Sequence, residues 1–144
     1  MNASIDSSSR EAAAQAAIEK LRALVKYADT CFFCTNAAGN VRPMGVREVD
    51  DEGNLWFLSA IDSQKNADIA ADPTVKLYFQ GGPHAEFLYL DGVASISTDR
   101  SRIQSLWHFV LRAWFADGKD DRRISAIKVT PTASFYWAAW QGAR

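Results

Sequence analysis

The sequence lacks the features that identify several large classes of protein. No apolar run approaches the ~20 residues that a membrane-spanning helix needs. The N-terminus has no basic segment followed by an apolar one, so it does not resemble a secretory signal, and we expect a cytoplasmic protein. The formal net charge is -1, so no excess of positive charge draws the chain to nucleic acid or to an anionic membrane.

Histidine and cysteine are scarce, and their placement predicts no metal site. Cys31 and Cys34 have the spacing of a CxxC pair, but there is no second such pair and no histidine cluster to complete a zinc site. Their segment is predicted to form a strand, in which residues three apart point to opposite faces, whereas a thioredoxin-like pair opens a helix. We therefore expect two reduced, structural thiols.

Motifs of common enzymes are missing as well. The chain contains no GxGxxG, no P-loop and no GxSxG elbow. His84 and His108 lack the partners of a nucleophilic triad, and the carboxylates are scattered through turns and helix ends instead of forming a pair. The residues themselves therefore predict no catalytic side chain.

What the chain contains is enough for one domain with a proper core. It has 144 residues, of which 48% are hydrophobic and 23% are charged. We expect a flexible tail at residues 1–7 and a single domain over residues 8–144. Apolar positions at helical spacing predict helices at about residues 8–28 and 99–116, with a shorter helix at residues 63–71.

Seven strands are predicted in the remainder of the chain. Glycine-containing turns join the first three as hairpins, and most consecutive strands are too closely linked for parallel crossovers. The predicted fold is therefore mainly β, an antiparallel barrel with flanking helices. The strands are expected at residues 30–36, 41–49, 54–60, 74–80, 86–97, 124–129 and 133–140.

Three local features point to a binding site, and each has a simpler structural explanation. Proline and glycine inside the strand at residues 42–45 mark either a bulge at a barrel corner or the close approach of a ligand. Lys65 stands in the first turn of a helix, where a cation opposes the helix dipole. That helix start suits a phosphate, unless Asp62 supplies the negative charge locally. The aromatic and charged segment at residues 112–123 is either a wall over a planar ligand or a helix end with a solvated loop.

Taken together, these segments resemble one known family. RPMGVREVDDEGNLWFLSAIDSQKNADIAADPTVKLYF, residues 42–79, resembles the FMN-binding core of the pyridoxamine 5′-phosphate oxidase-like split-barrel superfamily. AWFADGKDD and KVTPTASFYW, residues 113–121 and 128–137, are similar to the tail of its general-stress-protein branch. The resemblance implies an antiparallel split barrel that forms a homodimer, with two FMN molecules in grooves at the interface.

The resemblance also implies roles for particular residues, carried over by motif position. Arg42 and Lys65 would contact the FMN phosphate, assisted by Arg47, with Ser59 and Ser63 as hydroxyl partners. The isoalloxazine ring would lie along the remaining positions of the two motifs, which are Pro43, Met44, Phe57 and Leu58. Trp114 would contact the ring edge or the partner chain.

The chain departs from the family pattern near its end. Ala116 and Arg122 stand where this branch often has proline, and Ala138 stands where it often has aspartate, which puts the loop and the C-terminal contact in doubt. The longer vitamin-forming oxidases carry an arginine-rich motif at the C-terminus, which the ending WQGAR lacks. We therefore do not expect oxidation of pyridoxamine phosphate itself.

The expected function is that of an FMN-dependent oxidoreductase, which takes a hydride from NADH or NADPH and passes electrons to an unknown acceptor. One alternative is a flavin-binding stress protein without efficient turnover. A second is a split barrel that binds FAD, a deazaflavin or haem, although haem needs an axial histidine and only His84 and His108 are available. A third is a dimeric scaffold with no ligand.

Overall fold

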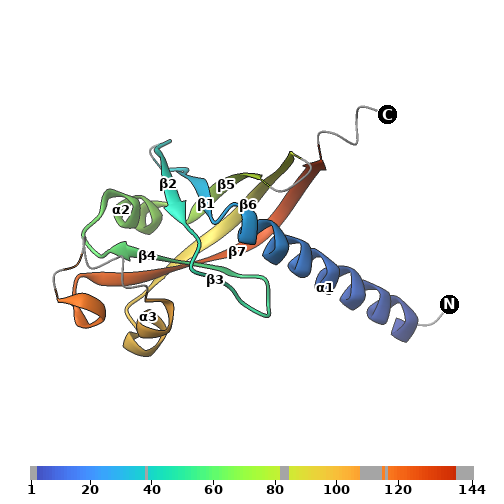
Figure 1. Ribbon diagram of the computed structural model, residues 1–144, viewed down its shortest axis with the longest axis horizontal. Helices are drawn as coiled ribbons and strands as arrows, with labels where there is room; N and C mark the ends of the chain where they lie inside the picture. The colour runs from blue at the N-terminus through green and yellow to red at the C-terminus, as the bar shows by residue number, and fades with distance from the viewer. Residues whose placement is uncertain (1–2, 38, 82–84, 108–114, 116, 139–144) are drawn as a thin grey trace.

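The protein is a curled antiparallel sheet with helices packed around it (Figure 1). The computed structural model describes residues 3–37, 39–81, 85–107, 115 and 117–138, and for residues 3–7 and 138 it describes the backbone alone. The helices are α1 Ala3–Tyr27, α2 Gln64–Ala71 and α3 Arg100–Leu106, with a 3₁₀ turn, η2, at Gly118–Asp120. The strands are β1 Thr30–Thr35, β2 Val41–Gly45, β3 Glu48–Val49, β4 Leu55–Ala60, β5 Thr74–Gly81, β6 Glu86–Ser97 and β7 Ile124–Ala138.

The sheet curls because its two outer strands are consecutive in the chain. The strand order is β2-β1-β5-β6-β7-β4-β3, and every pair is antiparallel. Only Val46 and Arg47 join the two outer strands, so a link of a few ångströms per residue holds the edges near each other. The Val46 N–H donates to the Asp29 carbonyl (2.6 Å) and the Arg47 N–H to the Trp56 carbonyl (2.8 Å). The predicted antiparallel barrel with flanking helices is confirmed.

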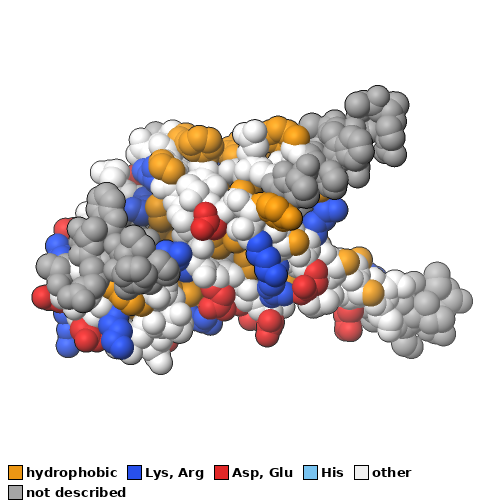
Figure 2. Space-filling model, viewed as in Figure 1, with side chains coloured by type: hydrophobic (Ala, Val, Ile, Leu, Met, Phe, Trp, Pro, Cys, Tyr) orange, Lys and Arg blue, Asp and Glu red, His pale blue; other side chains and the backbone are white. Residues whose placement is uncertain are grey.

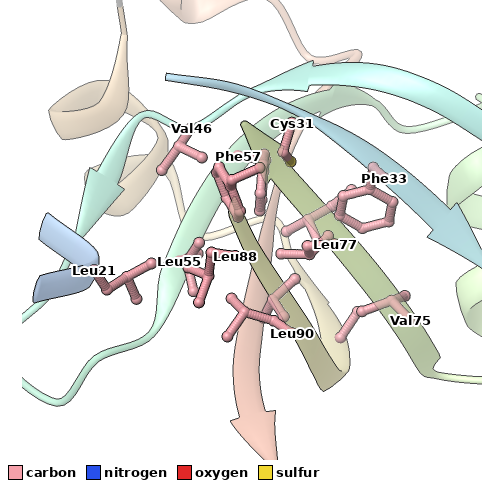
Figure 3. Close-up of a cluster of buried hydrophobic side chains, with 14 of the residues drawn as sticks. Leu21, Cys31, Phe33, Val46, Leu55, Phe57, Val75, Leu77, Leu88 and Leu90 are labelled. Atoms are coloured by element: carbon pink, nitrogen blue, oxygen red, sulfur yellow. The ribbon is translucent and has the colours of Figure 1, made fainter. Parts of the chain in front are cut away.

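The main core fills the inside of this curl (Figure 3). Alternate residues of β1 and β5 are buried, as expected for strands with one face inward. Phe33 and Phe57 are fully buried and meet edge to face, with ring centroids 5.2 Å apart. Burial of each such side chain contributes about 1.5–3 kcal/mol. Leu21 and Leu24 of α1 close this core at one end, while the first turns of α1 extend away from the barrel (Figure 1).

A second, smaller core lies under α3. It contains Trp56 and Leu58 of β4, Ile103 and Leu106 of α3, and Phe115. Because β4 packs against the main core on one face and against this second core on the other, all of its residues except the last are buried. The strand therefore shows no alternation of buried and exposed residues.

The strand boundaries differ from the predicted ones in two places. The strand expected at residues 41–49 is two strands, because its backbone changes partner: the Val46 N–H still bonds to Asp29, in register with β1, and the Arg47 N–H bonds to Trp56 of β4. The strands expected at 124–129 and 133–140 are one strand, β7, with a shift in register opposite Gly92. Pro131 lies at this irregularity, where its missing N–H is tolerated. A Cβ on Gly92 would lie 2.7 Å from the Val129 side chain, so β6 and β7 approach too closely here for any other residue.

Two helix boundaries also differ. Helix α1 begins at Ala3, within the segment for which a flexible tail was predicted. The helix expected to reach residue 116 ends at Leu106, because the backbone of Trp107 is extended (φ -64°, ψ 139°). Residues 108–114 and 116 lie outside the described part of the chain. None of the described helices combines the length and apolar character that crossing a membrane requires.

The cysteines lie as predicted, on opposite faces of β1. Cys31 is buried in the main core, Cys34 is half-buried on the outer face, and both are free thiols. Burial raises the pKa of Cys31 to about 12. Cys31 is therefore an unreactive core residue.

Candidate functional site

A cavity of about 420 Å³ opens between β2, β4, the start of α2 and the start of β7. Four separate segments of the chain meet there, and three of them are the motif segments singled out from the sequence. The lining residues are Pro43, Met44, Gly45, Arg47, Leu58, Ser59, Ala60, Asp62, Lys65, Phe115 and Arg123. The predicted site residues in this wall are Pro43, Met44, Arg47, Leu58, Ser59 and Lys65.

Helix α2 begins at the edge of the cavity. Ser63 caps it, because its Oγ accepts a hydrogen bond from the Asn66 N–H at 3.3 Å. The N–H groups of Gln64 and Lys65 belong to the first turn, where an α-helix offers them no internal acceptor. The start of α2 therefore places these backbone N–H groups and the positive end of the helix dipole beside the cavity.

A buried hydrogen-bond network fixes this helix start against the sheet. Ser59 Oγ donates to Asn66 Oδ1 at 2.8 Å and lies 2.7 Å from Ser125 Oγ. Asn66 Nδ2 donates to Ser125 Oγ at 2.9 Å, and Ser63 Oγ to Asn66 Oδ1 at 3.1 Å. The hydroxyls of Ser59 and Ser63 are thus engaged with the protein, so they hold the site in shape.

Lys65 carries the clearest electrostatic signal in the cavity. It is half-buried, and burial together with the charge of Arg42 lowers the pKa of its ammonium. Within residues 3–37, 39–81, 85–107, 115 and 117–138, no carboxylate forms an ion pair with it. A partly desolvated cation without a counter-charge favours an anionic ligand.

Arg42 does not line the cavity, because its guanidinium is engaged by Thr35 and Asp68. Its Nη1 donates to Thr35 Oγ1 at 3.2 Å and its Nη2 to Asp68 Oδ2 at 3.4 Å. Asp68 is almost fully buried and also accepts from Gln64 (2.8 Å), Asn40 (3.0 Å) and Thr35 (2.7 Å), which hold the pKa of its carboxyl far below the ordinary value. Arg42 nevertheless lies near enough to Lys65 to lower the pKa of that lysine.

Arg123 and Phe115 line the cavity, and the sequence did not identify either as a site residue. Arg123 Nε donates to Asp121 Oδ1 at 3.0 Å and its Nη2 to Oδ2 at 2.7 Å, so Asp121 fixes the guanidinium. The guanidinium carbon lies 5.8 Å from the centre of the Phe115 ring. Both residues belong to the segment 112–123, which was predicted to form either a wall over a planar ligand or a helix end with a solvated loop. In the structure both line the cavity.

Besides Arg42, two predicted residues, Phe57 and Ser63, do not line the cavity, and a third, Trp114, is not described. Phe57 is fully buried against Phe33, so its side chain is part of the main core and does not line the cavity. Ser63 sits behind the wall as the cap of α2. Trp114 lies outside the described residues.

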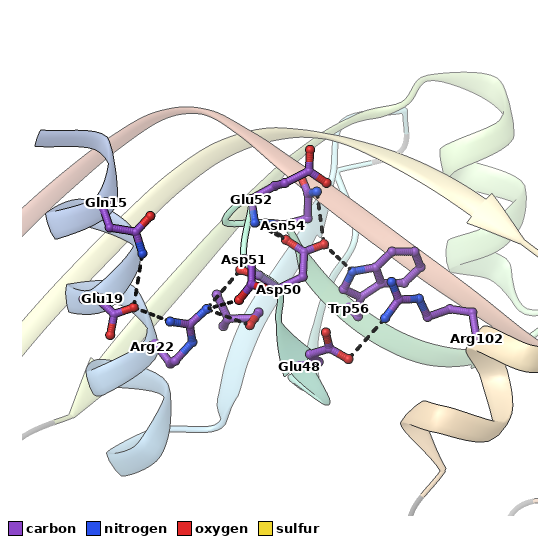
Figure 4. A network of polar contacts seen from close by, with 11 residues as sticks. Gln15, Glu19, Arg22, Glu48, Asp50, Asp51, Glu52, Asn54, Trp56 and Arg102 are labelled. Atoms are coloured by element: carbon purple, nitrogen blue, oxygen red, sulfur yellow. Dashed lines mark hydrogen bonds and ion pairs between the residues drawn. The ribbon is translucent and has the colours of Figure 1, made fainter. Parts of the chain in front are cut away.

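A polar network holds β3, the strand that follows the cavity residue Arg47, and the next turn against β4 and α3 (Figure 4). Asp50 accepts hydrogen bonds from the Asn54 N–H at 2.9 Å and from Trp56 Nε1 at 2.9 Å. Arg102 of α3 pairs with Glu48 at 3.2 Å and stacks 4.2 Å from the Trp56 ring centre. The turn that follows Arg47 is thereby held in place, and the carboxylate next to Arg47 in sequence is engaged by another cation.

The outer face of the sheet carries an exposed aromatic ladder next to the cavity. Tyr78, Tyr89, Phe135 and Trp137 stack in succession, with ring centroids 5.0, 5.6 and 6.4 Å apart. Hydrophobic side chains are visible along the side of the molecule that carries β1, β2 and β5 (Figure 2). A hollow of about 630 Å³ runs over this face, and Pro43 lines both the hollow and the cavity.

Comparison with known proteins agrees with this architecture. Residues 16–143 match the family model described as pyridoxamine 5′-phosphate oxidase like. Among curated proteins, Protein bli-3 of Neurospora crassa is 28% identical over 91 residues, which is 58% of this chain and 44% of the relative. The chain thus spans less than half the length of that curated relative.

Solved structures share the fold. General Stress Protein 26 from Bacillus anthracis str. Sterne superposes with a TM-score of 0.72 at 21% identity, over 83% of this chain and 92% of that chain. The general stress FMN/FAD binding protein from Xanthomonas citri superposes with a TM-score of 0.67 at 23% identity, over 76% and 80% of the two chains. These matches confirm the split-barrel fold and the resemblance stated from residues 42–79.

Proposed function

Because this chain belongs to the pyridoxamine 5′-phosphate oxidase-like family, we propose that it binds FMN in the cavity between β2, β4 and α2. The observation that carries the proposal is Lys65, a half-buried ammonium with a lowered pKa and no ion-pair partner in the described chain. A phosphate beside it would supply the missing counter-charge and accept hydrogen bonds from the first-turn N–H groups of α2.

The other residues of the cavity suit the remainder of a flavin. Met44, Leu58 and Phe115 offer apolar surface to a flat ring and exclude water from it. Bound FMN would supply hydride and electron transfer, and the chain would bind and orient it. Arg42 acts from behind the wall, where its charge adds to the positive potential around Lys65.

We also propose that two copies pair through the outer aromatic face. Phe32 is 59% exposed, Phe135 50% and Trp137 55%, which is unusual for side chains that stay in water. Aromatic residues are enriched in protein interfaces. Because Pro43 borders both this face and the cavity, a partner seated there would cover the open side of the flavin site.

The proposed activity is oxidation of NADH or NADPH through the bound flavin. A second candidate is flavin binding without efficient turnover, which the same cavity would support because the chain binds and orients the flavin in both cases. The two differ in the rate at which excess NADH or NADPH bleaches the bound flavin. Rapid bleaching supports the oxidoreductase, and flavin that stays oxidised supports the second candidate.

The test of the cofactor itself is a visible absorption spectrum of the purified protein, taken before and after FMN is added and removed by desalting. Peaks of oxidised flavin that survive desalting support the proposal. Retention of FAD or a deazaflavin in place of FMN would change the cofactor, and a Soret band would point to haem. Protein that retains none of these would overturn the proposal.

A further inference from the structure

We propose that Arg47 is a second recognition point in this cavity, which contacts the flavin ring system and favours its reduced, anionic form. This inference rests on the proposed function. It departs from the role that the family resemblance implied for Arg47, which was to assist the phosphate. The two roles require different positions along the cavity, and the sheet register separates them.

The positions of Arg47 and Lys65 along the cavity can be compared through strand β4, because both segments are hydrogen-bonded to it. The Arg47 N–H donates to the Trp56 carbonyl (2.8 Å) near the start of β4, and the Ser63 N–H donates to the Ala60 carbonyl (3.0 Å) at its end. The four residue-to-residue steps from Trp56 to Ala60 span about 13 Å at the usual rise. The backbone of Arg47 is therefore anchored near the start of β4, and the first turn of α2 with Lys65 is anchored at its end, so the two cations enter the cavity from opposite ends of this strand.

The charge of Arg47 is available to a ligand. Arg47 is half-buried in the cavity wall, and it forms no ion pair with any described residue. The neighbouring carboxylate, Glu48, pairs with Arg102 instead (Figure 4). Asp62 is the one carboxylate among the described lining residues, and it adjoins α2 at the opposite end. A guanidinium without a counter-charge therefore stands at the far end of the cavity.

The surroundings of Arg47 fit a flat ring better than a phosphate. Met44, Gly45 and Leu58 adjoin it in the wall, and a Cβ on Gly45 would meet nothing within 4 Å. Bound flavin that accepted a hydride, two electrons and one proton, from NADH or NADPH would carry one negative charge on its ring. The Arg47 guanidinium would stabilise that charge, most strongly where water is partly excluded.

The experiment compares FMN with riboflavin, which has the same ring and no phosphate, on wild-type protein and three variants. Arg47→Gln should weaken FMN and riboflavin by the same factor. It should also lower the preference for reduced over oxidised FMN by about tenfold, equivalent to a fall of about 30 mV in the two-electron midpoint potential. Arg47→Lys should restore most of that shift. Lys128→Gln, which removes a nearby cation that does not line the cavity, should change none of these values.

Two results would overturn the assignment of Arg47. If Arg47→Gln weakens FMN but leaves riboflavin affinity and the midpoint potential unchanged, then Arg47 contacts the phosphate. If it changes neither affinity nor potential, while circular dichroism shows the native fold, then Arg47 contacts no part of the flavin. Wild-type protein that binds neither compound would instead refute the proposed function, and with it this inference.

Discussion

Replacing Lys65 with alanine is the most direct perturbation of the proposed phosphate site. The ammonium lies half-buried in the cavity beside the first turn of α2, and burial and Arg42 already lower its pKa. A hydrogen bond to a charged group contributes roughly 1.5–3 kcal/mol, so Lys65→Ala should weaken FMN about ten- to hundredfold. Riboflavin, which has no phosphate, should bind the variant and the wild type alike.

The assay is calorimetric or fluorescence titration of FMN at fixed ionic strength, with Lys119→Ala as the control. Lys119 is exposed in η2 and does not line the cavity. The unfolding midpoint of ligand-free protein should stay the same or rise slightly in Lys65→Ala, because a cation in the first helical turn costs a few tenths of a kcal/mol. A loss of FMN affinity without a loss of stability therefore separates binding from folding.

The pH dependence gives a second readout with a definite sign. Phosphate binding needs the charged ammonium, whose pKa in the ligand-free protein lies below the ordinary 10.5. Wild-type affinity for FMN should therefore fall as pH rises through that lowered pKa, and Lys65→Ala should not show this fall. FMN affinity in Lys65→Ala within twofold of wild type, with the same pH profile, would refute the reasoning.

Three further predictions concern stability and assembly. Asp68→Asn should make the free energy of unfolding depend less on pH in the acid range. In the wild type the lowered carboxyl pKa stabilises the fold above the unfolded pKa of about 4, and that contribution is lost as pH falls. Urea unfolding at several pH values measures the difference. Phe57→Ala should cost about 3–5 kcal/mol in urea unfolding, because it leaves a cavity against Phe33; a cost below 1 kcal/mol would contradict that packing. Tyr78→Lys should convert a dimer to a monomer in light scattering, whereas Tyr27→Lys on α1 should not; dimers in both would exclude the aromatic face as the interface.

Local sequence signals predicted the hairpins of the barrel and missed where strands break or join. The glycine-containing turns correctly predicted that β1 pairs with β2 and that β3 pairs with β4. The break after Gly45 arises because the chain changes its partner from β1 to β4 between Val46 and Arg47, and no local pattern shows which strand a residue pairs with. A proline in the sequence argues against a continuous strand. Strand β7 nevertheless continues past Pro131, because the register shifts opposite Gly92.

The cavity shows the same division. Lys65 and Met44, chosen by motif position, line the cavity because the motif runs through segments that the sheet brings together. Phe57, chosen in the same way, has its side chain in the main core, and because β4 is buried on both faces its sequence does not show which residues face the cavity. Arg42 was expected in the wall, but the buried carboxylate of Asp68 draws its guanidinium toward α2.

The sequence by itself determined the antiparallel barrel, the family and the segments that build its cavity, because turn residues, strand alternation and motif order are local properties of the chain. Only the tertiary structure decided which cations face the cavity, because that depends on which carboxylate each one meets after folding. Asp121 fixes Arg123 at the wall, Asp68 holds Arg42 behind it, and Lys65 has no ion pair among the described residues. Charge pairing in the folded chain, local for Arg123 with Asp121 and long-range for Arg42 with Asp68, therefore selected the residues that can hold an anion.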